Sequence, residues 1–330
     1  MKESKILVTG SAGHLGEALV QTLSEANHEV VGIDIKDSRL TNEVGSIVNR
    51  SLVKHCMKGV DCVIHTATLH KPHIATHTRQ DFIDTNISGT LVLLEEAASE
   101  GVSSFIFTST TSVFGRALTP PPEEPAVWIT EDITPIPKNI YGVTKRSAED
   151  FCELFHRNHG LACLILRTSR FFPEQDDNKT VRQMYEDDNI KANEYLYRRV
   201  DLEDVVNSHL LALKQAPTIR FGKYIISATS PFSPTDLKEL RTNAPNVVRR
   251  LFPAYENAFA KLGWKMFSSI DRVYCNDKAR KELGWKPLYD FNYVLDRLIA
   301  GENPRSYIAR SIGSKGYHSS VFVDGPYPVE

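Results

Sequence analysis

Tyr141 and Lys145 have side chains and a spacing that suit a chemical reaction. In a helix they lie at i and i+4, one above the other on one face. A tyrosine, with a reference pKa of about 10, acts as a base near neutral pH only when its phenolate is stabilised. A lysine ammonium one turn away supplies positive charge for this purpose. The same spacing also occurs in exposed surface pairs, so the pair by itself leaves both interpretations open.

Hydroxyl side chains precede this pair, at the end of the segment SFIFTSTTS (104–112). We expect a buried strand here, with Ser109, Thr110 and Thr111 at its carboxyl end. Ligands of doubly wound folds bind at the carboxyl ends of the strands. A hydroxyl at this position is therefore expected to bind the substrate oxygen that Tyr141 deprotonates, which favours a catalytic role for the pair.

Gly10, Gly13 and Gly16 form a GxxGxxG pattern between an expected strand (5–9) and an expected helix (17–26). The first glycine permits a tight turn, the second lets the backbone approach a pyrophosphate, and the third lets helix and strand pack closely. Phosphates then lie against the N-terminus of the helix, where free N–H groups favour anions. This context favours a dinucleotide site over a plain tight turn.

Asp34 ends the next expected strand, EVVGID (29–34). A carboxylate at this position accepts hydrogen bonds from the ribose hydroxyls of NAD and repels the 2′-phosphate of NADP. Lys36 and Arg39 follow closely and leave NADP as an alternative. We expect NAD as the cofactor.

The elements that position these residues alternate between strand and helix along the chain. Further strands are expected at 61–65, 104–109, 162–167 and 223–227, and further helices at 82–101, 141–159, 201–215 and 276–283, with another helix beginning at 233–236. This alternation predicts an α/β fold, a Rossmann-type doubly wound parallel sheet with a smaller C-terminal substrate-binding lobe.

The expected domain boundaries follow from where this regular pattern ends. Residues 1–167, with 200–227 returning to them, are expected to form the NAD-binding domain, and 168–199 and 228–330 the substrate-binding lobe. The polar, acid-rich segment 172–193 is expected to be a loop or an ordered excursion. The segment 119–137 carries six prolines and is expected to be an extended loop.

Composition excludes several classes of function. The chain has 330 residues and a formal net charge of −2, so no global field attracts nucleic acid. Its five cysteines form no CxxC pair, which disfavours a zinc site or a disulfide framework. No apolar run approaches the roughly 20 residues of a membrane span, and no signal-peptide core is present, so we expect a cytoplasmic protein without a membrane partner. Four histidines within 65–77 leave a metal site as an alternative, although we expect none.

Several motifs occur together in the order found in one enzyme group. They are TGSAGHLG, DCVIHTAT, DTNISGTLVLLEEA, FIFTSTTSVFG, YGVTK, LILRT, RRVDLEDVVNSHLLAL and KARKELGW. With them the chain resembles the extended short-chain dehydrogenases/reductases and, within that group, the NAD-dependent epimerase/dehydratase family, which includes UDP-galactose 4-epimerase. The resemblance runs from the first strand to about residue 298.

The resemblance implies roles for individual residues. Tyr141 matches the general base, Lys145 its partner that also holds the nicotinamide ribose, and Thr110 the hydroxyl-bearing residue of the strand. Asn86 matches an asparagine that steadies the active-site strands. The expected cofactor-binding residues are Gly10, Ala12, Gly13, His14, Leu15, Gly16, Asp34, Ala67, His70, Asn86, Thr108, Tyr141 and Lys145.

Departures from the family pattern narrow the expected reaction. Dehydratases of the family have Asp-Glu where this chain has Thr111 and Ser112, which cannot remove water by acid–base catalysis. UDP-sugar epimerases have an asparagine where this chain has Arg170, which can instead grip a phosphate or carboxylate. An acid that contacts adenine is replaced by Ser46. Thr111, Arg170 and Arg272 are the expected substrate-binding residues.

The sequence therefore predicts an NAD-dependent enzyme that oxidises a hydroxyl of a sugar or sugar nucleotide. It leaves open whether the reaction ends in epimerisation or in net dehydrogenation. The alternatives are an NAD(P)-dependent dehydrogenase or carbonyl reductase for a non-nucleotide substrate, such as a sugar acid or small ketone, and a non-catalytic NAD sensor. Retention of Tyr141, Lys145 and Thr110 argues against the sensor. A homodimer through helices 82–101 and 141–159 is also expected.

Overall fold

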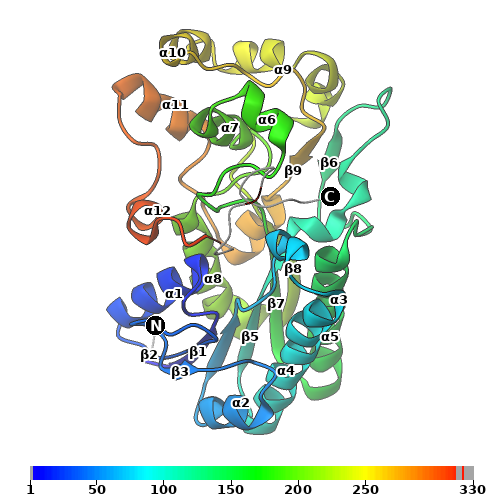
Figure 1. The fold of residues 1–330 in the computed structure, drawn as a ribbon. Helices are drawn as coiled ribbons and strands as arrows, with labels where there is room; N and C mark the ends of the chain where they lie inside the picture. The colour runs from blue at the N-terminus through cyan, green and yellow to red at the C-terminus, as the bar shows by residue number, and fades with distance from the viewer. Residues whose placement is uncertain (1–2, 317–321, 323–330) are drawn as a thin grey trace.

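Seven parallel strands form the central sheet, in the order β3-β2-β1-β4-β5-β7-β8 (Figure 1). The computed structural model describes residues 3–316 and 322. The strands are β1 Lys5–Thr9, β2 Glu29–Asp34, β3 Glu43–Val44, β4 Cys62–His65, β5 Ser104–Thr110, β7 Ala162–Thr168 and β8 Phe221–Ile226. This order confirms the predicted doubly wound sheet. From β1 the chain adds β2 and β3 on one side of the sheet, and then β4, β5, β7 and β8 on the other side. This change in the order of the strands, between β1 and β4, opens a crevice at their carboxyl ends.

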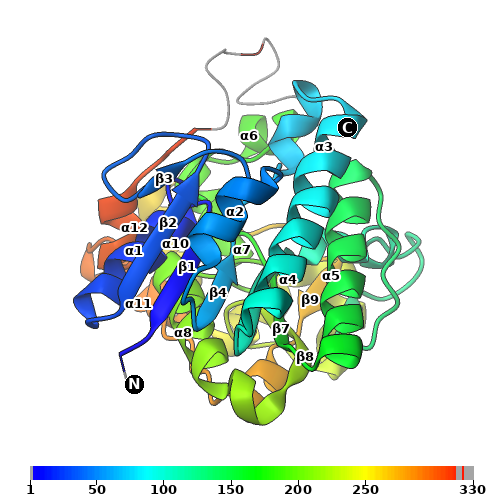
Figure 2. The ribbon, with the colours of Figure 1, turned by 90° about the horizontal axis from the view of Figure 1, so that it is seen from below.

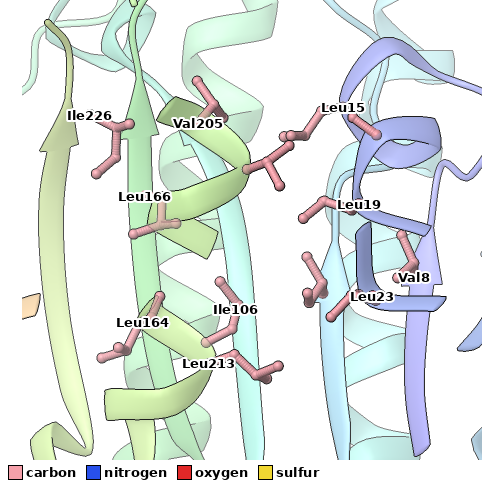
Figure 3. Packing of buried hydrophobic residues seen from close by; sticks show 14 of the residues in the cluster. Val8, Leu15, Leu19, Leu23, Ile106, Leu164, Leu166, Val205, Leu213 and Ile226 are labelled. Carbon is pink, nitrogen blue, oxygen red and sulfur yellow. The ribbon is translucent and has the colours of Figure 1, made fainter. Parts of the chain in front are cut away.

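Helices cover both faces of this sheet (Figure 2). On one face lie α1 His14–Glu25 and α8 Leu202–Ile219; on the other lie α2 Arg50–Met57, α4 Gly89–Glu100 and α5 Ile140–His159. Figure 3 shows side chains of α1 and α8, among them Leu15, Leu19 and Val205, packed with Ile106 and Leu166 of the sheet. Each fully buried aliphatic side chain of this kind contributes about 1.5–3 kcal/mol to stability.

The helix expected at 82–101 begins earlier than predicted. Thr78 and Asp81 form a capping box that starts α3 Arg79–Phe82. A π-helical stretch, Ile83–Ser88, then continues into α4, which ends before Gly101 at a φ of 73°. The left-handed conformation of Gly101 closes the helix where a residue with a side chain would be strained.

A second group of helices lies beyond the carboxyl ends of the strands (Figure 1). These helices are α6 Lys179–Met184, α7 Asp187–Glu194, α9 Leu237–Leu251, α10 Tyr255–Leu262 and α11 Phe291–Ala300. They share a separate hydrophobic core that includes Leu196, Leu240, Val247 and Phe291. The last helix, α12 Tyr307–Ile312, instead packs against α1 and α8. The remaining short helices are Lys71–Ala75, Thr111–Phe114, Arg116–Leu118, Pro234–Asp236 and Ala279–Leu283.

Two segments contain helices or strands that the sequence did not locate. The segment 172–193, expected as a loop or an ordered excursion, contains α6 and most of α7. The proline-rich segment 119–137 is not wholly a loop, because β6 Val127–Ile129 pairs in parallel with β9 Arg272–Tyr274. The domain boundaries remain a prediction, and their residues 1–2, 317–321 and 323–330 lie outside the described part of the chain. No helix in the described part is both long and apolar enough to cross a membrane.

Candidate functional site

A cavity of about 760 Å³ opens at the carboxyl ends of β1, β2, β4, β5 and β7, at the reversal point of the sheet. It brings together most of the residues that the sequence singled out: Gly10, Ala12, Gly13, His14, Leu15, Gly16, Asp34, Ala67, His70, Thr108, Thr110, Thr111, Tyr141, Arg170 and Arg272. Asn86 and Lys145 do not line the cavity and are buried behind its wall.

The glycine loop has the geometry of a pyrophosphate cradle. Gly10 has a φ of 77°, and a Cβ atom there would lie 2.8 Å from the Ala67 nitrogen. A Cβ atom on Gly16 would lie 1.9 Å from the Gly10 oxygen. Gly13 caps α1 and has no side chain with which to bind the N–H groups of the first turn, and such helix N-termini favour anions. These residues fit the diphosphate of a dinucleotide.

Asp34 lies at the end of β2, on the wall of the same cavity. Its Oδ2 accepts a hydrogen bond from the Ala12 N–H at 3.0 Å, and its Oδ1 accepts one from the Lys36 N–H at 2.9 Å. These bonds fix the carboxylate beside the glycine loop and leave each oxygen further lone pairs for ribose hydroxyls. Ile35, Ser46 and Ile47 line the cavity beyond Asp34 with apolar and hydroxyl-bearing side chains.

Replacing Asp34 with asparagine is expected to lower the preference for NAD over NADP by about tenfold or more, because hydrogen bonds to a charged acceptor are lost and the repulsion of a 2′-phosphate is removed. Titration of the variant with each dinucleotide measures the two dissociation constants. The exposed Asp37 gives a matched control, Asp37→Asn, which is expected to leave the preference unchanged. An unchanged preference in Asp34→Asn overturns the assignment of this carboxylate.

Tyr141 and Lys145 are both buried, which sets them apart from a surface pair. Asn139 caps α5 by accepting a hydrogen bond from the Gly142 N–H, and this fixes the first turn, which carries Tyr141. Tyr141 is 7% exposed. Burial raises the pKa of its phenol to about 12, although a hydrogen bond with Thr110 acts in the opposite direction. The phenol therefore needs added positive charge before it can act as a base.

Lys145 is 2% exposed and is held from the side of the sheet. Its Nζ donates a hydrogen bond to the Thr108 carbonyl oxygen at 2.7 Å and lies 4.0 Å from the centre of the Phe107 ring. Burial lowers the pKa of Lys145 to about 7, and the nearby Glu149 carboxylate acts against this effect. A group with this pKa changes charge close to neutral pH.

Asn86 connects the loop after β4 to helix α5. Its Oδ1 accepts hydrogen bonds from the Thr68 hydroxyl and the Leu69 N–H, both at 2.8 Å. Its Nδ2 donates to the Thr144 hydroxyl at 3.0 Å. The side chain thereby holds the loop that carries His70 against the helix that carries Tyr141.

The histidines of 65–77 lie in different environments. His65 is buried between the Thr9 and Thr90 hydroxyls, at 2.7 and 2.9 Å, and burial lowers its pKa well below the usual value. His70 lines the cavity with its ring centre 6.1 Å from that of Tyr141. Burial also lowers the pKa of His70, which is therefore neutral. Within residues 3–316, no group of three or more His, Cys, Asp or Glu side chains is arranged to hold a metal ion.

Arg170 is bound to acidic residues of the chain itself. Its Nη1 donates to Glu194 Oε1 at 2.8 Å and also to Asp176. Arg198 and Arg199 contact the same Glu194 carboxylate, each at 2.9 Å. Burial by itself raises the pKa of Glu194, but the charges of the three arginines prevail and lower it well below its usual value.

Arg272 reaches the cavity from β9, in the small sheet that the sequence did not predict. Its Nη1 lies 3.0 Å from both carboxylate oxygens of the adjacent Asp271. Lys138 also lines the cavity, and its Nζ donates to the Thr119 hydroxyl at 2.8 Å. The basic side chains at this end of the cavity are Lys71, Lys138, Arg170, Arg198 and Arg272.

Residues 314–316 contact the glycine loop, where the Lys315 N–H donates a hydrogen bond to His14 Nε2 at 3.1 Å. His14 Nε2 lies 2.9 Å from Glu174 Oε1. The same oxygen accepts hydrogen bonds from the Ser314 hydroxyl at 2.8 Å and from the Lys315 and Gly316 N–H groups, each at 3.2 Å. Lys315 and Gly316 line the cavity. No pattern in the sequence links residues this far apart.

The chain is similar in sequence to a known protein family and to individual proteins. The sequence model of the NAD dependent epimerase/dehydratase family matches residues 6–224. A dTDP-glucose 4,6-dehydratase of Streptomyces antibioticus is 27% identical, with 89% of this chain and 91% of that protein aligned. A putative UDP-glucose 4-epimerase of Methanocaldococcus jannaschii is 24% identical, with 89% and 97% aligned.

Solved structures share the fold. The UDP-glucuronic acid 4-epimerase of Bacillus cereus, in complex with UDP-glucuronic acid and NAD, superposes with a TM-score of 0.62 at 22% identity. The superposition covers 90% of this chain and 97% of that one. At this identity the likeness concerns the arrangement of helices and strands.

Proposed function

The chain belongs to the NAD-dependent epimerase/dehydratase family, whose cofactor is NAD, and from this premise we propose that it acts on a hydroxyl-bearing carbon of a sugar nucleotide as an epimerase. The observation that carries the proposal is the shared cavity. Tyr141 and Thr110 line one part of it, and the glycine loop and Asp34 line another. A dinucleotide held by the loop and a sugar beside Tyr141 would thus meet within a single cavity.

The proposed roles follow from the positions of the side chains. Bound NAD supplies the hydride acceptor and a positive charge near the phenol. Tyr141 takes the proton from the substrate hydroxyl, and Thr110, which bonds to Tyr141, orients both oxygens. Lys145, when protonated, supplies positive charge that lowers the pKa of the Tyr141 phenol toward neutral pH. Because Lys145 must be protonated, activity is expected to fall as pH rises through the Lys145 pKa.

Dehydration fits the site less well than epimerisation. The short helix Thr111–Phe114 follows β5, and Thr111 and Ser112 line the cavity with hydroxyl groups where removal of water needs a carboxyl acid and base. Two acidic groups on the cavity wall are engaged elsewhere, since Glu174 contacts His14 and Asp177 pairs with Lys71. These arrangements support an epimerase or a dehydrogenase over a dehydratase.

The contact between residues 314–316 and the glycine loop supports an epimerase over a dehydrogenase. An epimerase regenerates its NAD in every cycle and can retain it, whereas a dehydrogenase must release NADH. Burial raises the pKa of Glu174, but the hydrogen bond and charge of His14 lower it to about 2, so the carboxylate stays ionised at neutral pH. We propose that its hydrogen bonds to Ser314, Lys315 and Gly316 restrict the exit of a dinucleotide.

Replacing Glu174 with glutamine is expected to speed NAD release by about tenfold, because charge-assisted hydrogen bonds to residues 314–316 are each weakened. The protein is first loaded with radiolabelled NAD and then diluted into excess unlabelled NAD. The loss of protein-bound radioactivity with time gives the release rate. Glu302→Gln, which alters only an exposed pair with Arg297, is the control. Equal release rates for wild type and Glu174→Gln would remove this support for the epimerase.

A dehydrogenase or carbonyl reductase for a non-nucleotide substrate is the second candidate. It is favoured by the state of Arg170, whose guanidinium already pairs with Asp176 and Glu194 and does not require a substrate phosphate. A panel of UDP-sugars, dTDP-sugars, uronic acids and small ketones, each assayed with and without added NAD or NADH, separates the candidates. Conversion that depends on a nucleotide group and needs no added cofactor supports the epimerase; turnover of added cofactor with free acids or ketones supports the second candidate.

A further inference from the structure

The last three residues of β5 contact three successive functional positions of α5. The Thr108 carbonyl accepts from Lys145, the Ser109 hydroxyl donates to Glu149 Oε1 at 2.5 Å, and Thr110 bonds to Tyr141. Glu149 follows Lys145 by one turn on the same helix face. These hydrogen bonds fix the end of β5 relative to α5. Two of them involve Tyr141 and Lys145, the expected catalytic pair.

Glu149 is a fully enclosed carboxylate with a fixed orientation. It is 1% exposed, and Arg167 of β7 grips it with Nε 3.1 Å from Oε1 and Nη2 2.7 Å from Oε2. Arg167 is itself buried and also donates to the Glu131 carbonyl at 3.4 Å. Neither Glu149 nor Arg167 lines the cavity, and both are buried.

A buried lysine keeps its charge only with help from its surroundings. Burial lowers the pKa of Lys145 to about 7, and Glu149 is the strongest of the charges that raise it. The titratable side chains that interact with Lys145 are Glu149 and Cys152 of its own helix, His65 of β4 and His70 of the following loop. On β7, Arg167 pairs with Glu149 and Cys163 contacts Cys152. Among them Glu149 is the group that is both anionic and held by two hydrogen-bonding partners.

We propose that Glu149, fixed by Ser109 and Arg167, is a positioning residue that keeps Lys145 charged and aligned beneath Tyr141. This inference rests on the proposed function, because it matters only if Lys145 supports the Tyr141 base. A purely structural role is the competing explanation: the buried Glu149–Arg167 pair also ties α5 to β7. The two explanations differ in what happens to Lys145 when the fold is intact.

The variants are chosen to keep that fold intact. Glu149→Gln keeps the shape of the side chain but leaves the Arg167 guanidinium buried without its anion. The double variant Glu149→Gln/Arg167→Met removes both charges and avoids that penalty. Glu153→Gln is the matched control, one turn further along α5, where Glu153 pairs with Lys223 at 3.1 Å near the surface.

The measurement is the titration of Lys145 by NMR in NAD-loaded protein with ¹³Cε-labelled lysine, assigned with Lys145→Arg. We expect the Lys145 pKa to fall by about one unit in Glu149→Gln, because loss of an anion disfavours the ammonium. The fall should be smaller in the double variant, because the positive charge of Arg167 is lost together with the anion. The alkaline limb of the activity profile should move to lower pH by the same amount, while Glu153→Gln should match wild type.

An unchanged Lys145 titration in both folded variants overturns the inference. A lower Lys145 pKa without a shift in the alkaline limb of the activity profile also overturns it, since Lys145 would then not limit activity. The proposed function fails separately, through full activity of a Tyr141→Phe variant. A result in which Tyr141→Phe is inactive and Lys145 titrates normally in Glu149→Gln thus rejects the role of Glu149 alone.

Discussion

Tyr141→Phe is expected to lower kcat about a thousandfold, the size of effect that a positioned general base contributes. The substitution removes one hydroxyl and keeps the buried ring, so packing around the start of α5 is preserved. The phenol is the group that lines the cavity, bonds to Thr110 and lies one turn from Lys145. Steady-state turnover of a converted sugar nucleotide gives the measurement.

The control for this variant is its content of bound NAD and its thermal unfolding midpoint, both of which should match wild type. Equal NAD content shows that the cofactor cradle is unaffected by the change. A variant that retains wild-type kcat contradicts the assignment of Tyr141 as the base, whatever the identity of the substrate.

Gly16→Ala is expected to weaken NAD binding at least about a hundredfold, since the cradle must deform before a dinucleotide can bind. The added Cβ would lie 1.9 Å from the Gly10 oxygen and 2.6 Å from the Gly10 carbonyl carbon. Backbone atoms cannot rotate away as a side chain does, so α1 must move away from the loop. Equilibrium titration with NAD measures the loss.

Gly59→Ala separates this steric effect from a general cost of replacing glycine. Gly59 has a φ of 66° in the turn after α2, and a Cβ atom there would meet nothing within 4 Å. The control is expected to lose some stability through backbone strain and to bind NAD as wild type does. Normal NAD affinity in a folded Gly16→Ala variant would show that the loop is not the pyrophosphate cradle.

The central sheet could be predicted from the sequence because its strands are buried on both faces. Such strands appear as continuous apolar runs, and β1 and β2 have the bounds that their runs indicate. Helix α5 was also predicted to within one residue, since its apolar positions repeat with helical spacing and Gly160 ends it at a φ of 67°. Local patterns sufficed for these elements.

The helices within 172–193 could not be predicted in the same way. Most of α7 is buried although it is polar, because its Glu194 is neutralised by Arg170, Arg198 and Arg199. A buried ionic cluster leaves no hydrophobic periodicity from which a helix could be inferred. The pairing of β6 with β9 likewise joins segments far apart in the chain, and neither strand is long enough to show alternation.

The residues of the candidate site also fall into those that local sequence patterns predict and those that depend on the tertiary fold. The glycine loop, Asp34 and the Tyr141–Lys145 pair are local motifs, and the structure gathers them around one cavity, with Lys145 behind its wall. The contacts of Glu149 with Ser109 and Arg167, and of Glu174 with residues 314–316, depend on the tertiary fold. The sequence thus indicated the reacting groups, and the structure adds the residues that hold them.

The most direct test of the account is the conversion of a UDP-sugar by the NAD-loaded protein after all free NAD has been removed. NMR of the sugar identifies the product, and denaturation afterwards releases the bound dinucleotide for mass spectrometry. We predict many turnovers per protein molecule, a product inverted at one hydroxyl-bearing carbon, and close to one NAD recovered per chain. Absence of any epimer across the panel of sugar nucleotides, or conversion only when free NAD is supplied and reduced, would contradict the account.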